Sequence, residues 1–268
     1  MRDNFVDFHL HTTCSDGAWT PKRLFDEVRA RGLEYFCVSD HDTVDAYPVP
    51  ADLRSRCVSG LEIDTENRGQ TVHVLAYGMN QFNGGLMSRL RQQRENRAFR
   101  GKLIVERLNQ LGVDLSFDDV VEVAKTTKSV GRPHIARALV AKNHCPSIQA
   151  AFDVYLAEGC GAYVPLERLA TAEAVDLIHE AGAVAILAHP KRLRDQHDLS
   201  ALCKVFDGVE VVHPTADSEY ERQLFDLVDS HDMLASGGTD FHARPGEGDI
   251  GIAFSQSRVK QLLEAVGA

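Results

Sequence analysis

The residues best suited to chemistry in this 268-residue chain are histidines and carboxylates that recur in short motifs. These motifs are H-x-H at 9–11, D-H-D at 40–42, G-L-E at 60–62, A-H-P at 188–190 and T-D-x-H at 239–242, with His73 inside a further apolar run. Each motif is weak alone, because a short motif arises easily by chance. Together they supply many nitrogen and oxygen donors and no cysteine, a set that suits Mn²⁺, Zn²⁺, Fe²⁺ or Mg²⁺.

Two of these motifs place a pair of donors two residues apart. His9 and His11 form one pair, and Asp240 and His242 form the other. Side chains alternate along an extended strand with a period of two, so His9 and His11 point to the same face. The same holds for Asp240 and His242 if that segment stays extended. A lone histidine is more often a core or surface residue than a ligand. Two same-face pairs nevertheless favour a shared metal site.

The elements that must position these residues are short strands separated by helices. Apolar runs predict strands at 5–10, 35–39, 57–63, 71–77, 183–188, 208–212 and 233–236. Thr20 and Pro21 open a predicted helix over 22–31 that stops at Gly32, and Thr171 caps another that runs to Ala181. This alternation indicates parallel pairing in an α/β barrel or open sheet.

In such a domain the carboxyl ends of parallel strands share one face, where active sites are built. We therefore expect the motifs to converge there. His73 fits less well, because it falls early in its run. A reversed or offset fourth strand would accommodate it.

The strand–helix alternation breaks between residues 81 and 165. Helical patterns cover 86–111, 117–124 after a Ser116 cap, 133–142 and 148–158. We interpret 81–165 as a helical insertion, or cap, on a metal-binding domain made of 1–80 and 166–268. The first of these helices carries seven basic residues, for most of which a solvated charged face is the simpler interpretation.

The overall composition limits the class of partner. A net charge of −10 argues against a broad grip on long nucleic acid, although metal ions could reverse the local sign for a small phosphorylated ligand. No run of about 18 apolar residues predicts a membrane span. The first residues lack the apolar segment of a secretory signal, so we expect a cytoplasmic protein. The cysteines form no C-x-x-C pair and indicate no disulfide framework.

Several segments resemble the PHP (polymerase and histidinol phosphatase) superfamily of phosphoesterases. They are DFHLHTTCSDG (7–17), VSDHDT (38–43), GLEID (60–64), VHVLAYG (72–78), LAHP (187–190) and GGTDFH (237–242). The match spans nearly the whole chain, and its motifs are specific in combination. The segment GRPHIARAL (131–139) is similar to the branch that contains RNase AM and the 3',5'-nucleoside bisphosphate phosphatases.

This resemblance implies a distorted seven-stranded TIM-like (β/α)7 barrel that holds two to three divalent ions, with manganese as the first choice and magnesium, zinc or iron as alternatives. By motif position the ligands would be His9, His11, Asp16, His41, Glu62, His73, His189, Asp240 and His242. Glu62 would bridge two ions. His9, His11 and Asp240 would complete one site, His73 and His189 a second, and Asp16, His41 and His242 a third. Spacing alone would make Asp16 a turn carboxylate.

The implied reaction is attack of a metal-bridging hydroxide on a phosphate ester, with Glu62, His189 and Asp240 as catalytic residues. The resemblance indicates removal of the 3'-phosphate from nucleoside 3',5'-bisphosphates such as 3'-phosphoadenosine 5'-phosphate. Alternatives are a 5'-to-3' exoribonuclease acting on short 5'-phosphorylated RNA, a histidinol phosphate phosphatase, a non-catalytic metal-binding module and an amide hydrolase. No strand end carries the bridging lysine that the last would want.

Candidates for binding substrate phosphate lie in the insertion. Arg132 and His134 are the first choice, because a guanidinium offers a bidentate fork to phosphate. Arg94, Asn96 and Arg97 are weaker candidates. Without the resemblance, a surface ion pair for Arg132 and a helix start for His134 are equally good interpretations.

Overall fold

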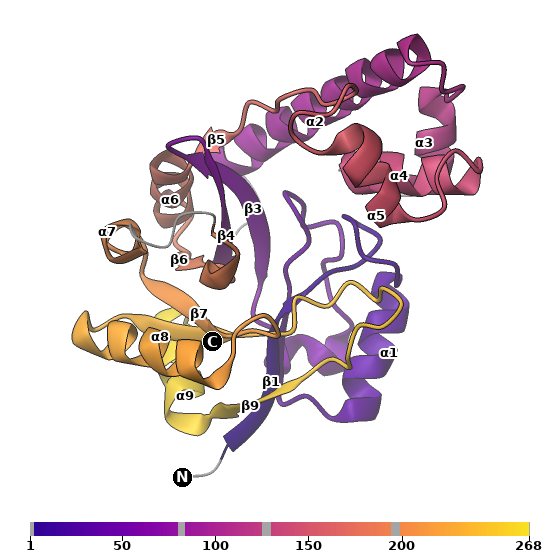
Figure 1. The fold of residues 1–268 in the computed structure, drawn as a ribbon. Helices are drawn as coiled ribbons and strands as arrows, with labels where there is room; N and C mark the ends of the chain where they lie inside the picture. Colours follow the sequence, from indigo (N-terminus) through magenta and orange to yellow (C-terminus); the bar gives the residue numbers. More distant parts are fainter. Residues whose placement is uncertain (1–2, 80–83, 125–129, 194–198, 268) are drawn as a thin grey trace.

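The computed structural model describes residues 3–79, 84–124, 130–193 and 199–267, which form a mixed α/β fold with two sheets. The smaller sheet has the order β2-β1-β9, with β1 at Asp3–Leu10, β2 at Tyr35–Val38 and β9 at Ile252–Ser255. The larger has the order β5-β3-β4-β6-β7-β8, and Figure 1 labels its strands from β5 to β7. Its strands are β3 Gly60–Asn67, β4 Gln70–Tyr77, β5 Leu169–Ala170, β6 Val184–Leu187, β7 Gly208–Val212 and β8 Leu234–Gly237. The predicted strands are all present, with small shifts of their ends.

Strand direction departs from the all-parallel expectation. β1–β2, β6–β7 and β7–β8 are parallel, but β4 is antiparallel to both β3 and β6, and β9 is antiparallel to β1. The reversal of β4 follows from a two-residue turn, in which Arg68 and Gly69 both have positive φ, as a tight hairpin requires. The allowance for a reversed fourth strand is therefore confirmed, and it explains why His73 falls early in β4.

The ladders of the described residues make two sheets and not one closed barrel. Single bridges join them, at Leu10–Phe241, Phe36–Cys57 and His41–Glu62. These bridges hold the carboxyl ends of β1 and β2 beside β3 and beside the segment after β8. The α/β class is confirmed, and barrel closure stays a prediction.

Helices cover the sheets and form the outer layer. They are α1 Pro21–Arg31, α6 Thr171–Glu180, α7 Leu199–Cys203, α8 Ser218–Ser230 and α9 Gln256–Ala265, with short 3₁₀ turns at Ala51–Arg56 and Pro190–Arg192. The start of α1 is as predicted, since Thr20 Oγ1 accepts from Arg23 N at 3.3 Å and Gly32 ends the helix at φ 69. Thr171 is the first helical residue and not the N-cap, because its hydroxyl lies 2.8 Å from Thr65 Oγ1 in the core.

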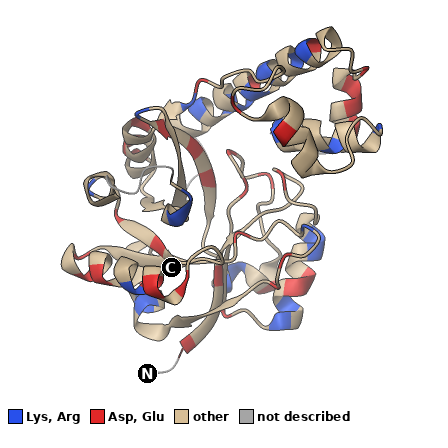
Figure 2. Cartoon of the chain, in the orientation of Figure 1, with Lys and Arg blue, Asp and Glu red and all other residues tan. Residues whose placement is uncertain are grey.

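Between β4 and β5 lies a group of helices that we call the helical cap. It consists of α2 Gly85–Gln110, α3 Phe117–Ala124, α4 Arg132–Ala141, α5 Ile148–Ala151 and a π-helical turn at Phe152–Leu156. Figure 1 shows these helices together at one end of the molecule, and Figure 2 shows lysines and arginines along α2. Ile104, Leu108, Ile135 and Leu139 belong to an apolar cluster separate from those of the sheets.

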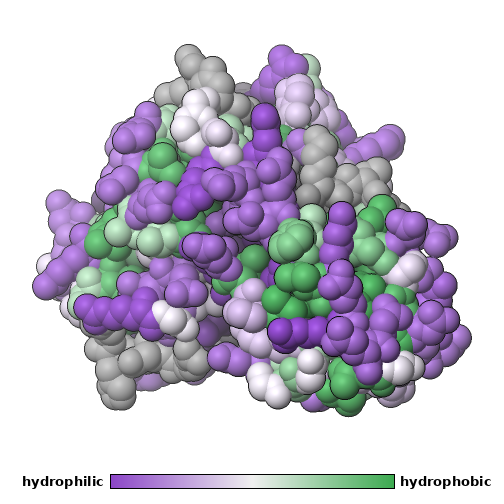
Figure 3. Space-filling view, turned by 90° about the horizontal axis from the view of Figure 1, so that it is seen from above, coloured by the Kyte–Doolittle hydropathy of each residue, from purple (hydrophilic) through white to green (hydrophobic). Residues whose placement is uncertain are grey.

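The predicted division at 80/81 lies outside the described residues, and the division at 165/166 falls in the loop before β5. The domain boundaries therefore stay a prediction. Figure 3 shows the face seen from above, where hydrophilic residues cover most of the surface. Among the described helices, none combines the length and apolar character needed to cross a membrane.

Candidate metal centre

The strands and the loops that follow them bring the nine predicted ligands into one cluster. His9 belongs to β1, Glu62 to β3 and His73 to β4, while the others lie in the loops that follow β1, β2, β6 and β8. Their donor atoms form three overlapping groups, each within 4.8 Å. The groups are His9, His11, Glu62 and Asp240; Glu62, His73 and His189; and His11, Asp16, His41 and His242.

Glu62 lies at the centre of this cluster, and its side chain is buried. Its Oε2 atom faces three imidazole nitrogens, those of His9 at 3.3 Å, His11 at 3.3 Å and His41 at 3.2 Å. Its Oε1 atom faces Nδ1 of His73 at 2.9 Å and Nε2 of His189 at 3.0 Å. Each oxygen therefore serves a different group, which is the arrangement that a bridging carboxylate requires.

Asp240 has one oxygen directed into the cluster and one directed out of it. Oδ1 lies 3.4 Å from His9 Nε2 and 3.2 Å from His11 Nε2. Oδ2 accepts from Arg192 at 2.5 Å and lies 3.5 Å from Nε2 of His213. The outer contacts leave Oδ1 available to a cation.

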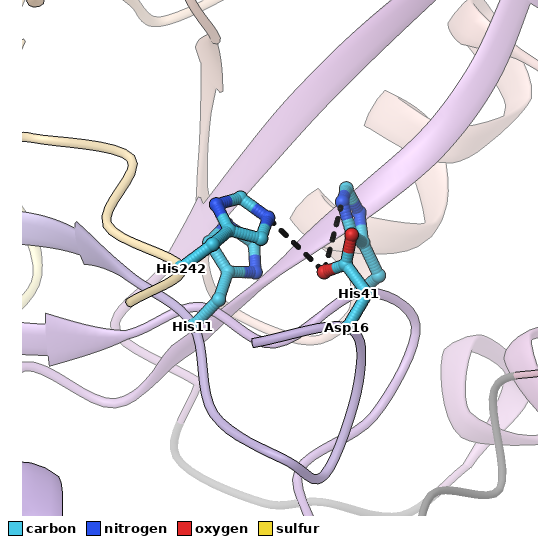
Figure 4. A group of neighbouring side chains, drawn as sticks. All are labelled: His11, Asp16, His41 and His242. Atoms are coloured by element: carbon cyan, nitrogen blue, oxygen red, sulfur yellow. Dashed lines mark ion pairs between the residues drawn. The ribbon is translucent and has the colours of Figure 1, made fainter. Parts of the chain in front are cut away.

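Figure 4 shows the third group, in which Asp16 faces His41 and His242. Asp16 Oδ1 lies 3.0 Å from His242 Nε2 and 4.0 Å from His41 Nε2. The loop reaches this position because residue 17 is glycine, since a Cβ there would lie 2.7 Å from the carbonyl carbon of His11. Gly17 next to Asp16 is thus the sequence signal for this donor.

The donor set fits divalent cations. Several buried atoms of the described cluster have no hydrogen-bond partner, namely His9 Nε2, His11 Nδ1 and Nε2, Asp16 Oδ1, His41 Nδ1, Glu62 Oε2 and His189 Nδ1. A buried polar atom without a partner costs about 1–3 kcal/mol, so a native site with so many of them calls for an ion. These clustered groups indicate divalent metals.

Electrostatics in the cluster point the same way. Burial alone would raise the pKa of Glu62, but the imidazoles of His41, His9 and His73 outweigh it and hold that pKa well below its ordinary value. Burial would lower the pKa of His41, yet Glu62 and Asp64 raise it well above its ordinary value. Without metal, a proton on His41 therefore supplies positive charge that these carboxylates need.

The backbone is strained where several of these donors leave their strands. Asp42, His189 and Asp240 have φ values of 55°, 27° and 51°. Non-glycine residues avoid this left-handed region, and such strain gathers at functional sites. The strained turns direct the side chains that follow the strands toward the cluster.

Two carboxylates at the cluster escaped the sequence analysis. Asp64 Oδ1 lies 3.0 Å from His41 Nδ1 and 3.4 Å from His73 Nε2, and its signal was its same-face position two residues after Glu62. Glu210, fully buried in β7, lies 2.8 Å from His9 Nδ1 and accepts from the backbone of His189 at 2.6 Å. The sequence signal for Glu210 is that it is a glutamate inside an apolar strand.

Asp7, which opens the DFHLH segment of β1, holds backbone groups. It accepts from the backbone N–H groups of Thr239 at 3.0 Å, Gly251 at 2.9 Å and His9 at 3.2 Å. Burial raises its pKa to about 6. Asp7 therefore ties β1 to the segment that carries Asp240.

A cavity of about 400 Å³ opens onto the cluster and is lined by arginines. Arg97 and Arg100 of α2 and Arg132 of α4 line it from the cap, and Arg168 lines it from the loop before β5. Arg100 Nη2 and Arg168 Nε are buried without a hydrogen-bond partner among the described residues. Burial, with repulsion from Arg132 and Arg168, lowers the pKa of Arg100 to about 10. Converging cations with unused donors are what an anion requires.

The predicted phosphate-binding residues occupy varied positions. Arg132 lines the cavity and donates to the Leu156 carbonyl at 3.2 Å, and Arg97 lines it while paired with Asp42 and Asp64. Asn96 is exposed on α2, and Arg94 donates to the backbone carbonyl of Asp42.

His134 also lines the cavity, with Nδ1 accepting from Gly131 N at 3.1 Å. Burial, assisted by Arg137, lowers its pKa to about 4. A neutral imidazole with one nitrogen already used is a weaker phosphate ligand than the arginines around it. Among the arginines that line the cavity, Arg97 Nε, Arg100 Nη2 and Arg168 Nε are buried donors without a partner in the described part of the chain, and of these three residues the sequence suggested only Arg97.

Known proteins with similar sequences are phosphoesterases. The chain is 32% identical to the 5'-3' exoribonuclease Rnm of Salmonella typhimurium over 88% of this chain and 84% of that protein. It is 29% identical to the 3',5'-nucleoside bisphosphate phosphatase of Chromobacterium violaceum, over 92% and 90% of the two chains. No family model matches the chain.

Solved structures agree in fold. A predicted metal-dependent phosphoesterase from Bifidobacterium adolescentis superposes with a TM-score of 0.84 at 30% identity, over 97% of this chain and 96% of that one. A Chromobacterium violaceum protein described as an amidohydrolase, with bound sulfate and no metal, gives a TM-score of 0.87 at 26% identity over the same shares of the two chains.

With a cluster of histidines and carboxylates at its strand ends and relatives of this kind, the chain is a metal-dependent phosphoesterase. It belongs to the PHP superfamily.

Proposed function

We propose that this protein removes the 3'-phosphate from nucleoside 3',5'-bisphosphates, such as 3'-phosphoadenosine 5'-phosphate, to leave the 5'-monophosphate. One observation carries the proposal: the carboxylate–histidine cluster and the Arg100–Arg132–Arg168 group line the same cavity. A substrate with two phosphates can place one at each. The relative that acts on nucleoside bisphosphates supports this choice.

In this proposal the nine clustered side chains hold two to three divalent ions, with manganese as the first choice and Glu62 shared between two of them. Bound divalent ions make water a stronger acid and neutralise charge on the phosphoryl group. His189 lies 3.0 Å from Glu62, and Asp240 accepts from Arg192 at 2.5 Å. These contacts support a role for both residues in holding or passing a proton. Arg192 is half exposed at the cavity and can contact the phosphate that is cleaved.

The finer points of the fold belong to this proposal as well. The bridges between the two sheets support a distorted seven-stranded barrel formed by 1–80 and 166–268. The separate apolar cluster of α2–α5 supports 81–165 as a cap over its mouth. A cytoplasmic location remains an expectation.

Histidinol phosphate suits the cavity less well. Its amino group is positively charged near neutral pH, and it would face arginines that already repel one another. A second phosphate would remove that repulsion. The cavity therefore favours a substrate with two anionic groups.

Exonucleolytic cleavage of short 5'-phosphorylated RNA is the second candidate. The exoribonuclease relatives support it, and so does a cavity of about 570 Å³ that shares Ser15 and His134 with the first. That volume offers room for a further nucleotide. Both candidates would bind a 5'-phosphate at the arginine group.

The test compares phosphate release from 3'-phosphoadenosine 5'-phosphate, histidinol phosphate and 3'-AMP with nucleotide release from a short 5'-phosphorylated RNA. We expect the highest kcat/KM with the bisphosphate. Preference for RNA would establish the second candidate, and preference for histidinol phosphate would overturn both. Activity that survives complete removal of metal would overturn the metal-dependent chemistry.

Replacing Arg168 tests the second phosphate position directly. We expect Arg168→Ala to lower kcat/KM about 10- to 100-fold for the bisphosphate, the loss of about 1.5–3 kcal/mol that a charged hydrogen bond provides. 3'-AMP lacks the 5'-phosphate, so its kcat/KM should stay nearly constant. Arg91→Ala, an exposed arginine of α2, is the control. Equal losses for both substrates would place the 5'-phosphate elsewhere.

A further inference from the structure

We propose that the cap builds part of the metal centre: Arg97 of α2 and Arg137 of α4 are positioning residues for the donor group His11, Asp16, His41 and His242. This inference rests on the metal binding included in the proposed function. It gives both cap arginines a role toward one ion. The evidence comes from two sides of that group.

The first side is reached from α2. Arg97 is 8% exposed, and its Nη2 pairs with Asp42 and lies 3.2 Å from Oδ2 of Asp64. The other oxygen of Asp64 lies 3.0 Å from Nδ1 of His41, whose Nε2 faces Asp16. Asp64 Oδ1 and His41 Nδ1 form no hydrogen bond, but a carboxylate this close attracts the imidazole electrostatically and so favours one position of the ring. Arg97 thus acts on His41 through Asp64.

A second contact from α2 strengthens this link. Gln93 donates to Oδ1 of Asp42 at 3.0 Å and to the backbone carbonyl of Asp64 at 2.9 Å. Asp42 and Asp64 are therefore held by one face of a cap helix. Because Asp42 is buried and Asp64 is largely so, both carboxylates depend on these cationic and amide partners.

The other side is reached from α4. Arg137 Nη2 donates to the backbone carbonyl of Asp16 at 2.6 Å. His134, on the same helix, contacts the preceding loop residue, Ser15. From the sheet side, Asp40 accepts from Ser15 Oγ at 2.5 Å and from Thr12 N at 2.7 Å. The loop that carries Asp16 is thus held by Asp40 on the side of the sheets and by α4 on the side of the cap.

The remaining donors have supports within the sheets. His9 and the backbone of His189 are held by Glu210 of β7, and the backbone before Asp240 is held by Asp7 of β1. Asp64 does lie 3.4 Å from His73, so Arg97 has some influence on a second group. Arg137 contacts only the Asp16 loop among the donor-bearing segments described, and it gives the cleaner test.

The experiment counts metal ions in the full-length protein. Wild type, Arg137→Met and Arg97→Met are stripped with chelator, titrated with Mn²⁺ by calorimetry and assayed for bound manganese after gel filtration. We expect each variant either to lose one bound ion per chain or to bind that ion at least about 10-fold more weakly. Arg137→Met should keep the ions that bind more tightly. Arg91→Met on α2 is the matched control and should bind as wild type does.

The lysine variants Arg137→Lys and Arg97→Lys keep the charge and should restore much of the lost binding. Circular dichroism and melting temperature, measured on every sample, show whether each variant folds. If a methionine variant does not fold, its lysine variant is tested in its place. Manganese affinities and stoichiometry within twofold of wild type in both methionine variants would overturn the inference. A wild-type protein that binds no ion would instead overturn the proposed function.

Discussion

Glu62 shows how much one side chain can determine at the residue scale. It is buried, it touches five imidazoles, and its two oxygens serve different donor groups. A buried carboxylate without compensating charge would be very costly, and here the surrounding imidazoles compensate it. Removing the charge while keeping the shape isolates this contribution.

We expect Glu62→Gln to abolish turnover and leave the fold intact, because an amide keeps the volume but cannot join two cations. The loss should exceed the roughly 10- to 100-fold that an outer-shell partner costs. Glu66→Gln, farther along β3 and partly exposed, should remain close to wild type. Steady-state phosphate release and circular dichroism measure the two properties. Near-normal turnover of Glu62→Gln would contradict a bridging role.

At the scale of elements, the site depends on how closely β1 approaches the segment after β8. A Cβ on Gly238 would lie 2.5 Å from the Cβ of His9 and 2.6 Å from its backbone nitrogen. Neither atom can move without moving the H-x-H strand. Only glycine permits the approach that brings Asp240 to His9 and His11.

The variant Gly238→Ala should therefore destabilise the protein by about 1–3 kcal/mol, the usual cost of overpacking. It should also weaken metal binding, because His9 is pushed from its position. Gly248→Ala is the control, since a Cβ there would meet no atom within 4 Å. Thermal unfolding with and without Mn²⁺ tests this. An unchanged melting temperature in Gly238→Ala would show that β1 and β8 are not packed as described.

At the scale of the whole molecule, a net charge of −10 surrounds a site that must accept anions. The arginines at the cavity and the bound cations resolve this conflict locally. In the metal-free protein, protonated imidazoles supply this positive charge. Burial by itself would lower the pKa of His9, but Glu210, Glu62 and Asp240 outweigh it. The net effect raises that pKa well above its ordinary value, and His41 behaves likewise.

Metal binding should therefore release protons. His9 and His41 have raised pKa values and are protonated near neutral pH in the metal-free protein, whereas ligating imidazoles are neutral. Affinity should rise with pH until those pKa values are passed, by about tenfold per pH unit for each proton released. Calorimetry in buffers of different ionisation enthalpy counts the protons. A binding heat independent of buffer would show that the imidazoles are already neutral.

Much of the architecture follows from local pattern. The apolar runs predicted the strands from β1 to β8, apart from the short β5, because strand formation depends on side-chain alternation and turn residues that a single segment contains. The H-x-H spacing predicted same-face donors, and the position of His189 after an apolar run predicted that donor. The T-D-x-H segment is not extended, because Asp240 has a φ of 51°, so strand alternation does not explain its donors. Glu62 was expected near the end of a strand over 57–63, whereas it is the third residue of β3. Asp16 came from family resemblance alone.

The tertiary structure decided what depends on contacts between distant segments. The antiparallel course of β4, the partners Asp64 and Glu210, and the pairing of Arg97 with two carboxylates all join residues far apart in the chain. So does the arginine group that includes Arg100 and Arg168. An arginine on a helix has the same local pattern whether it faces solvent, a carboxylate or a cavity. Only the packing of the cap against the sheets distinguishes these cases, since packing determines which charges lose water.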